Sequence, residues 1–193
     1  MPLLLEVDAR LAQGKRTVLA IDGPCGSGKT TLAALLARLY DCPVFHADDF
    51  FLRPEQRTPA RFAEPGGNLD RERLLEEVLA PLRQGQPVSF CRFDCHSLTL
   101  LPPVAVAPSS LAVVEGSYSL HPALAPMYDL SVCLTLSPEL QRRRILARNG
   151  EAMARRFFER WIPLEQAYFD ALKPQTRCSF LIEADQLSDE APL

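Results

Sequence analysis

The sequence predicts an α/β fold, in which a mostly parallel sheet carries helices on both faces. Three observations support this class. Short apolar runs alternate with longer segments of helical periodicity through most of the chain, and strands joined through helices run parallel. The first apolar run leads directly into a glycine-rich turn, and two later runs end beside acidic residues. In such sheets, ligands bind beyond the carboxyl ends of the strands.

The first part of the chain predicts two helices, two strands and a loop. Residues 3–13 form a short helix with leucines on one side, which ends at Gly14, and residues 17–21 form the first strand. Apolar residues with helical spacing cover 30–40 and stop at Asp41-Cys42-Pro43, after which 44–46 form a second strand. Residues 53–69 are rich in Pro, Arg and Gly, and a loop of this length suggests a function.

The middle of the chain predicts a helix followed by strands. Asp70 begins a helix that continues to about Gln84, with leucines on one face and Gly85 beyond its end. Residues 88–93 form a strand, and 95–110 form a further strand or an extended excursion with a turn. Residues 111–116 form a buried strand that ends in the acid Glu115.

The last part of the chain predicts a strand, a helical lid and a final strand. Ser131 to Leu136 form a strand, and Ser137 and Pro138 then fit the N-cap and first position of a helix. Residues 138–148 and about 151–172 form helices separated by Asn149-Gly150, with the lid covering about 138–160. Ser179 to Glu183 form the last strand, and we expect all of 1–193 to be a single domain.

The turn after the first strand fits the phosphate-binding pattern G-x-x-x-x-G-K-[ST]. Its glycines let successive backbone N–H groups face the phosphates, Lys29 adds a positive charge, and Thr30 offers a hydroxyl to Mg²⁺. The sequence therefore predicts that the chain binds a nucleoside triphosphate, with ATP and Mg²⁺ as cofactors. The residues expected to bind the nucleotide are Gly23, Pro24, Cys25, Gly26, Ser27, Gly28, Lys29, Thr30 and Thr31.

Acids at strand ends are the candidates for catalysis and metal binding. Asp48 follows the second strand and could accept the proton of an attacking hydroxyl, while Asp49 could do the same or cap the turn. Glu115 ends a buried strand, where an acid can hold Mg²⁺ directly or through water, although a solvated glutamate would look the same. His46 lies on a strand, and packing explains it better than catalysis.

Other polar residues have a functional and an ordinary interpretation. Asp70 could contact the acceptor or simply cap its helix, and Asp94, near His96, could be a polar strand end. Arg144 and Arg148, four residues apart on one helix face, could neutralise charge in the transition state or form a solvated face. Phe157, Phe158 and Trp161 are interpreted as core.

Composition limits the classes of partner. A net charge of −3 and a pI near 5.7 argue against nucleic acid or an anionic membrane, although arginines cluster at 142–144 and 155–160. The N-terminal residues lack the pattern of a secretory signal, and no transmembrane span is evident. The six cysteines form no C-x-x-C pair, which predicts reduced thiols and a cytoplasmic location; Cys91 and Cys95 fit strand packing.

Together these residues resemble the uridine kinase-like family of P-loop small-molecule kinases, from Thr17 to about Tyr168. The resemblance rests on AIDGPCGSGKTT (20–31), HADDFFL (46–52), CRFDCH (91–96), VVEGSY (113–118) and RRRILARN (142–149). It implies a P-loop NTPase-type three-layer sandwich with a helical lid. Asp49 stands where the family has Ser, Phe51 and Phe93 where it has Tyr, and Asn149 where Asp is common.

The resemblance also implies roles for individual residues. Asp48 matches the catalytic aspartate, Glu115 the magnesium-associated glutamate, Asp70 the aspartate that holds ribose hydroxyls, and Arg144 and Arg148 the lid arginines. The substrate-binding residues expected on this basis are Asp48, Asp70, Phe93, Asp94 and His96. His96 is not a secure counterpart of the family's pyrimidine-binding histidine, because its spacing from Asp94 is shorter.

The expected activity is ATP-dependent phosphoryl transfer to a small-molecule hydroxymethyl group, with the 5′-OH of uridine or cytidine as the leading acceptor. A related alternative is a kinase for another small alcohol or vitamin precursor, of the pantothenate, glycerate or nicotinamide riboside type. An alternative of another class is a nucleotide-dependent switch or binding module, although the chain has no N-K-x-D guanine-binding motif. The expected partner is a small hydroxyl acceptor, and a homo-oligomer is left open.

Overall fold

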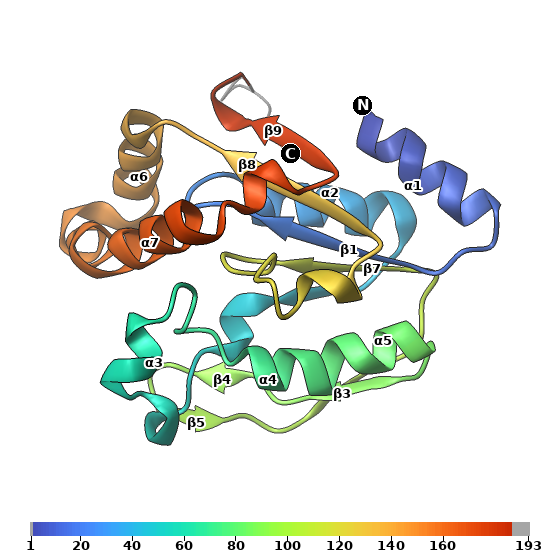
Figure 1. The fold of residues 1–193 in the computed structure, drawn as a ribbon, viewed down its shortest axis with the longest axis horizontal. Helices are drawn as coiled ribbons and strands as arrows, with labels where there is room; N and C mark the ends of the chain where they lie inside the picture. Colours follow the sequence, from blue (N-terminus) through green and yellow to red (C-terminus); the bar gives the residue numbers. More distant parts are fainter. Residues whose placement is uncertain (1, 187–193) are drawn as a thin grey trace.

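A five-stranded parallel sheet forms the centre of the protein (Figure 1), whose computed structural model describes residues 2–186. Every neighbouring pair of strands is parallel, as the sequence predicts. Strand β1 lies in the middle, and all six of its residues are buried. In sheet order the strands are β2 (Val44–His46), β7 (Leu111–Glu115), β1 (Thr17–Asp22), β8 (Leu130–Thr135) and β9 (Phe180–Glu183).

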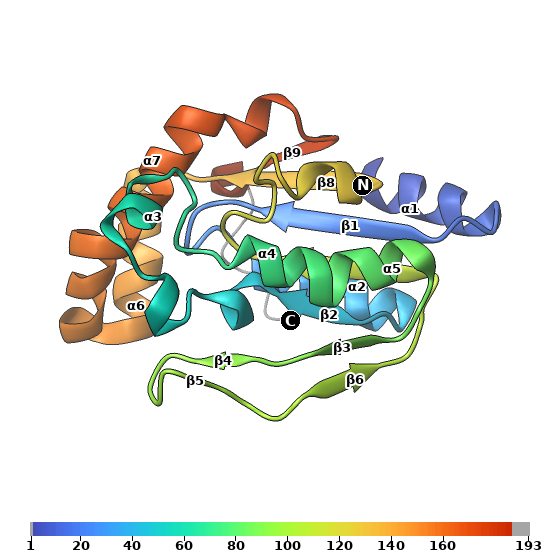
Figure 2. The ribbon, with the colours of Figure 1, turned by 60° about the horizontal axis from the view of Figure 1, so that its bottom comes forward.

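Helices cover both faces of the sheet, so the protein has three layers (Figure 2). Helices α1 (Pro2–Ala12) and α2 (Lys29–Tyr40) pack on one face through residues such as Leu3 and Leu36. The other face is covered by a continuous helix made of α4 (Arg71–Arg73), a π-helical stretch (Leu74–Leu79) and α5 (Ala80–Gln84). This helix matches the one predicted over 70–84, and the α/β fold class is confirmed.

The strand predicted over 88–93 is wrong in its length. The segment forms two short strands, and neither of them joins the central sheet. Strand β3 (Val88–Phe90) pairs antiparallel with β6 (Val104–Val106), and β4 (Phe93–Asp94) pairs with β5 (Thr99–Leu100). Together they form the ribbon along the lower edge of Figure 2. Pro102 and Pro103 separate β5 from β6, because proline has no backbone N–H to donate to a ladder.

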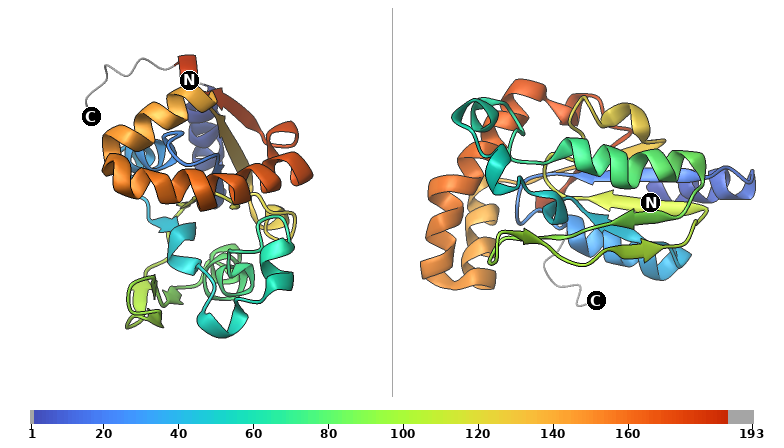
Figure 3. Two further views of the ribbon diagram at one scale, coloured as in Figure 1. Left: turned by 90° about the vertical axis from the view of Figure 1, so that its left-hand side faces the viewer. Right: turned by 90° about the horizontal axis from the view of Figure 1, so that it is seen from below.

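The lid consists of α6 (Pro138–Arg156), a π-helical turn (Phe157–Trp161) and the start of α7 (Ile162–Leu172). Ser137 caps α6 through its side-chain oxygen, which accepts from the Leu140 N–H at 3.3 Å. The break predicted at 149–150 is present as a kink at Gly150, whose φ of 69° and ψ of 169° suit glycine almost alone. Seen end-on, α6 and α7 lie across the end of the sheet (Figure 3).

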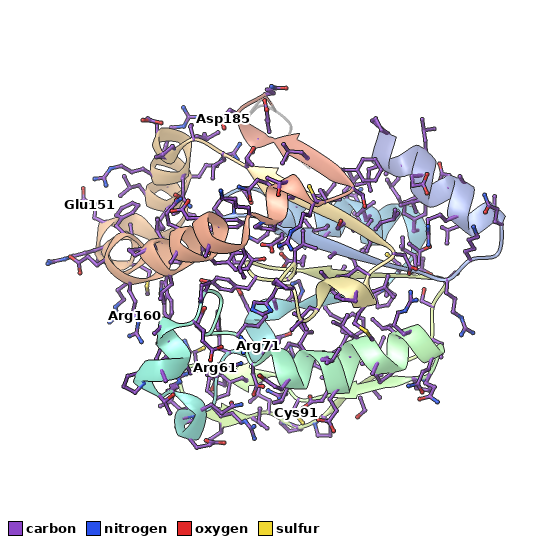
Figure 4. All side chains as sticks on the ribbon, viewed as in Figure 1. Arg61, Arg71, Cys91, Glu151, Arg160 and Asp185 are labelled. Carbon is purple, nitrogen blue, oxygen red and sulfur yellow. The ribbon has the colours of Figure 1, made fainter. Side chains whose placement is uncertain are left out.

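The predicted loop 53–69 is ordered around one arginine. Arg61, on helix α3 (Pro59–Ala63), donates to the carbonyls of Gly67 at 2.9 Å and Leu69 at 3.0 Å, and it forms an ion pair with Glu72. The loop is therefore held against α4 (Figure 4). The remaining short turns are 3₁₀ helices at Ala47–Phe50, Pro54–Gln56, Ala125–Met127, Pro174–Thr176 and Ala184–Gln186.

Two further observations concern the whole of the described chain. All six cysteines are free, as the absence of paired spacing predicts. Within residues 2–186, no helix has the length and apolar character needed to cross a bilayer.

Candidate active site

The phosphate-binding loop connects β1 to α2, as predicted. Gly28 stands at the N-cap of α2 with φ 99°, a left-handed conformation that favours glycine. Gly23 leaves no room for a side chain, because an added Cβ would lie 2.7 Å from the Leu134 carbonyl oxygen. Lys29 Nζ donates to the carbonyls of Gly23 at 2.8 Å and Pro24 at 3.1 Å. All the residues predicted to bind nucleotide lie on this loop or on the first turn of α2.

A cavity of about 290 Å³ lies beside this loop, at the carboxyl ends of the sheet strands. The segments that line it are far apart in sequence: the phosphate loop, the turn after β2, the loop 57–68, the end of β7, the lid and α7. Lining residues include Lys29, Thr30, Asp48, Glu115, Tyr118, Arg148 and Glu165. This is the position at which ligands bind in parallel α/β sheets.

Thr30 and Glu115 lie next to each other, as a magnesium site requires. Thr30 Oγ1 donates to Glu115 Oε1 at 3.2 Å, and the same oxygen accepts from His46 Nδ1 at 2.6 Å. The hydrogen bond to Glu115 raises the pKa of His46. His46 is thus paired with the strand-end acid rather than simply packed, which sequence reasoning missed.

The donor set at this point fits Mg²⁺. A hydroxyl and one carboxylate supply oxygen ligands, and Mg²⁺ in phosphoryl-transfer sites takes its other ligands from phosphates and water. Among residues 2–186, no group of three His, Cys, Asp or Glu side chains could hold a metal on its own. Thr30 and Glu115 are therefore the residues that would hold Mg²⁺ together with a nucleotide.

Asp48 and Asp49 occupy the turn directly after β2, and they have different surroundings. Asp48 lines the cavity and is exposed to solvent, yet the surrounding cavity walls desolvate its carboxyl group and raise its pKa, and the charge of Lys29 opposes that shift. Asp49 is half-buried and does not line the cavity. Desolvation also raises the pKa of its carboxyl group, and the charges of His46 and Arg92 lower that pKa in part. Of the two candidates, Asp48 is the one that faces the phosphate loop's lysine across the cavity.

Four predicted substrate contacts lie outside the cavity wall. Asp70 is fully buried as the N-cap of α4 and accepts from the Arg73 N–H at 3.2 Å, while its Oδ2 lies 3.6 Å from Arg53 Nε. Asp94 accepts from the backbone N–H of His96 at 2.9 Å, which makes it a turn cap. Phe93 is buried and His96 is exposed. From this region only Cys95 lines the cavity, so these acceptor contacts remain predictions.

Both predicted lid arginines lie near the phosphate loop. Arg144 Nη1 donates to the Gly26 carbonyl at 3.2 Å. Arg148 lines the cavity, and its guanidinium lies 5.7 Å from the centre of the Phe157 ring. Phe157 and Trp161 also line the cavity, so the interpretation of these two aromatic residues as core is wrong. They are half-buried because the lid turns their rings toward the cavity and not toward the sheet.

Sequence reasoning missed Asp22, the last residue of β1. Its buried carboxylate accepts from the backbone N–H groups of Gly23 at 2.6 Å, Tyr118 at 3.1 Å and Leu120 at 2.9 Å, and from the Tyr168 hydroxyl at 2.7 Å. Burial raises the pKa of Asp22 to about 6, and the Tyr168 hydrogen bond opposes the shift. Its position as an acid at a strand end was the signal that could have identified it.

Sequence reasoning also missed Glu165, which lies on α7 and accepts a hydrogen bond from the phosphate loop. Its Oε2 accepts from the Cys25 N–H at 2.8 Å and its Oε1 from the Ser117 hydroxyl at 2.7 Å. The Ser117 hydroxyl lies 3.0 Å from the Gly23 carbonyl. No pattern in the sequence distinguishes Glu165 from the other acids of its helix, because its partners come from distant segments.

The parallel sheet and the glycine-rich loop after β1 define a fold of the P-loop NTPase type. No protein-family model and no curated protein matches the chain. Among solved structures, a possible uridine kinase from Bacillus stearothermophilus matches with a TM-score of 0.67 and 23% identity, over 94% of this chain and 100% of that chain. A proposed fructose transport system kinase from Silicibacter sp. TM1040 matches with a TM-score of 0.64 and 23% identity, over 81% and 86%.

These likenesses show the fold. The predicted resemblance to the uridine kinase-like family is thus confirmed in architecture, including the parallel sheet and the position of the phosphate loop.

Proposed function

We propose that the protein is an ATP- and Mg²⁺-dependent kinase that transfers a phosphoryl group to a hydroxymethyl group of a small molecule. One observation carries the proposal: the phosphate loop, the Thr30–Glu115 pair and Asp48 all line a single cavity at the carboxyl edge of the sheet. Phosphoryl transfer requires little from a protein beyond positioning and charge neutralisation, and these residues supply both.

Each residue has a role that its position supports. The loop amides and Lys29 hold the phosphates. To do so, Lys29 gives up its hydrogen bonds to the Gly23 and Pro24 carbonyls and donates to phosphate oxygens instead. Arg144 and Arg148 approach from the lid and neutralise charge on the transferring group. Asp48 accepts the proton of the attacking hydroxyl. Thr30 and Glu115 are the residues that would hold Mg²⁺, which would supply neutralisation of the phosphate charge.

The acceptor is the open part of the proposal. The 5′-OH of uridine or cytidine is the prediction from the sequence, and the name of the Bacillus stearothermophilus protein agrees with it. Acceptors of the pantothenate, glycerate or nicotinamide riboside type are the alternatives. A cytoplasmic location and a small-molecule partner, rather than nucleic acid or a membrane, belong to the same proposal.

The test is an assay of ATP consumption with a panel of acceptors, in which the phosphorylated product is identified by mass spectrometry. We expect at least one acceptor to be phosphorylated and the Lys29→Ala variant to lose that activity. If no acceptor is phosphorylated and none raises ATP consumption, the kinase proposal fails. Nucleotide-dependent capture of a protein partner, without any acceptor, would instead support a switch.

A further inference from the structure

Three arginines line the cavity without a carboxylate partner among the described residues: Arg57, Arg148 and Arg160. Arg148 is already assigned to the phosphate loop, which leaves Arg57 and Arg160 without a role. Three arginines close to Arg57 in the sequence differ from it, because each pairs with an acid. Arg53 lies 3.6 Å from Asp70, Arg61 lies 2.6 Å from Glu72, and Arg71 lies 2.7 Å from Glu64. Arg57 and Arg160 thus present charge to the cavity that no described carboxylate neutralises.

Both guanidinium groups are held in place by aromatic rings. Arg57 lies 5.5 Å from the centre of the Phe93 ring, and its Nε donates to the Leu52 carbonyl at 2.9 Å. Arg160 lies 5.0 Å from the centre of the Trp161 ring. Such contacts orient the planar fork of an arginine, and the Nη groups keep N–H donors for a ligand.

Arg57 lies on the acceptor side of the cavity. Burial raises the pKa of the Cys95 thiol. The charge of Arg57 lowers this pKa and the charge of Asp48 raises it, so Arg57 and Asp48 are both close enough to Cys95 to influence its thiol. Arg148 instead acts on Cys25 of the phosphate loop, as Lys29 does. The cavity therefore has one set of positive charges at the phosphates and a second near the proposed base.

Arg160 reaches the same side from the lid. The ring of its neighbour Trp161 stacks on Phe51 with centroids 6.2 Å apart and planes inclined by 23°, and Phe51 follows Asp48 by three residues. Figure 4 shows Arg160 on the side of the lid that faces α3. A ligand between the lid and the turn after β2 would thus meet flat rings together with two guanidinium groups.

We propose that the acceptor is an anionic alcohol: its hydroxymethyl group faces Asp48, its flat or apolar body lies against Phe51 and Trp161, and a carboxylate at its other end binds Arg57 and Arg160. This inference rests on the proposed kinase function. A carboxylate fits because the fork of an arginine matches its two oxygens. An analogue without the carboxylate loses the charge-assisted hydrogen bonds to both guanidinium groups, so the site discriminates against it.

The experiment compares acceptors in matched pairs that differ in a carboxylate. The pairs are orotidine with uridine, nicotinate riboside with nicotinamide riboside, and pantothenate with pantothenol. For the pair that the enzyme uses, we expect kcat/KM to be about 10- to 100-fold higher for the acid, as hydrogen bonds to charged groups imply. Equal or better turnover of the neutral member would overturn the inference while leaving the kinase function intact.

Variants test the residues themselves. Arg57→Gln and Arg160→Gln should each raise KM for the acidic acceptor by about 10-fold or more, with little change for its neutral partner or for ATP. Arg156→Gln is the matched control, because Arg156 is an exposed arginine of the same lid that does not line the cavity. An equal rise in KM for both members of a pair would also overturn the inference. Failure to phosphorylate any acceptor, charged or neutral, would instead remove the kinase proposal on which it rests.

Discussion

Asp48 is the residue on which the proposed chemistry depends most directly. Replacing it by asparagine keeps the size of the side chain and removes the ability to accept a proton. We expect Asp48→Asn to lower kcat by about 10²- to 10⁴-fold, the range of general-base catalysis, with ATP affinity nearly unchanged. Steady-state kinetics and nucleotide titration check this. Asp49→Asn is the control, since Asp49 does not line the cavity; full activity in Asp48→Asn would remove Asp48 from this role.

Asp22 makes stability depend on pH in a defined direction. Its pKa rises from 3.8 to about 6 on folding because of burial, so the folded state holds a proton that the unfolded state has lost. The Asp22 contribution to the free energy of unfolding is therefore present below about pH 4 and falls, by about 3 kcal/mol in total, as pH rises to about 6. Asp22→Asn lacks this dependence.

The measurement is urea unfolding of the parent and of Asp22→Asn from pH 4 to pH 7. Asparagine has one acceptor oxygen for the donors that meet at this position, so we expect the variant to be less stable at pH 4. We expect the difference in stability to move in favour of the variant as pH rises. A difference that stays constant over this range would show that Asp22 does not titrate there.

Residues at strand ends were the part of the site that could be predicted. Asp48, Glu115 and the phosphate loop follow buried strands, and strand polarity alone brings them to one edge. The same rule would have found Asp22. Glu165, Arg57 and Arg160 could not be found in this way, because their positions depend on how the lid and the loop 53–69 fold over the sheet.

At the scale of elements, α7 connects the lid to the phosphate loop. Two of its residues, one turn apart, bind the start of that loop: Glu165 holds the Cys25 N–H and Tyr168 binds Asp22. The lid and α7 are continuous through the π-helical turn Phe157–Trp161. A movement of the lid would therefore shift α7 and change the hydrogen bonds that hold the phosphate loop.

Removing the Glu165 carboxylate should loosen the loop. In Glu165→Ala the half-buried Cys25 N–H loses its acceptor; a fully buried donor left unpaired costs about 1–3 kcal/mol, so we expect a loss of stability up to about that size. We expect faster amide exchange in peptides covering residues 23–28 and a lower urea midpoint. Gln166→Ala, at an exposed neighbouring position on α7, should change stability by less than about 0.5 kcal/mol. Unchanged exchange at the loop would contradict a positioning role for Glu165.

The helices were more predictable than the ribbon of β3 to β6. Helix α2, the helix over 71–84 and the kink at Gly150 follow from local capping and periodicity. The ribbon depends on antiparallel pairing between segments that carry no hairpin signal of two turn residues, so its register could not be derived from the sequence. The aromatic residues of the lid were misinterpreted because periodicity does not say which surface a helix covers.

At the scale of the whole molecule, nucleotide binding should stabilise the protein. A ligand at 100 times its Kd adds about 2.7 kcal/mol, which for a chain of this size raises Tm by about 5–10 °C. We expect Mg²⁺-ATP to produce such a shift and Lys29→Ala to lose it. Thermal unfolding with and without nucleotide measures this, and a full shift in Lys29→Ala would contradict the role of the loop.

The architecture as a whole followed from the sequence because the alternation of strands and helices leaves few topologies. Right-handed crossovers and a phosphate loop after the first strand fix a parallel sheet with β1 inside it. The order of the other strands was not derivable, since it depends on which crossovers reach across β1.

The central position of β1 has a consequence for biosynthesis. Its two neighbours pair with it through Leu111 and Leu130, so both are made about a hundred residues after Thr17. At typical rates of synthesis, this apolar segment waits roughly 5–20 seconds on the ribosome before β8 emerges. During that interval the faces of β1 can be covered only by helices already made, α1, α2 and the helix over 71–84, while both of its hydrogen-bonding edges lack a partner strand.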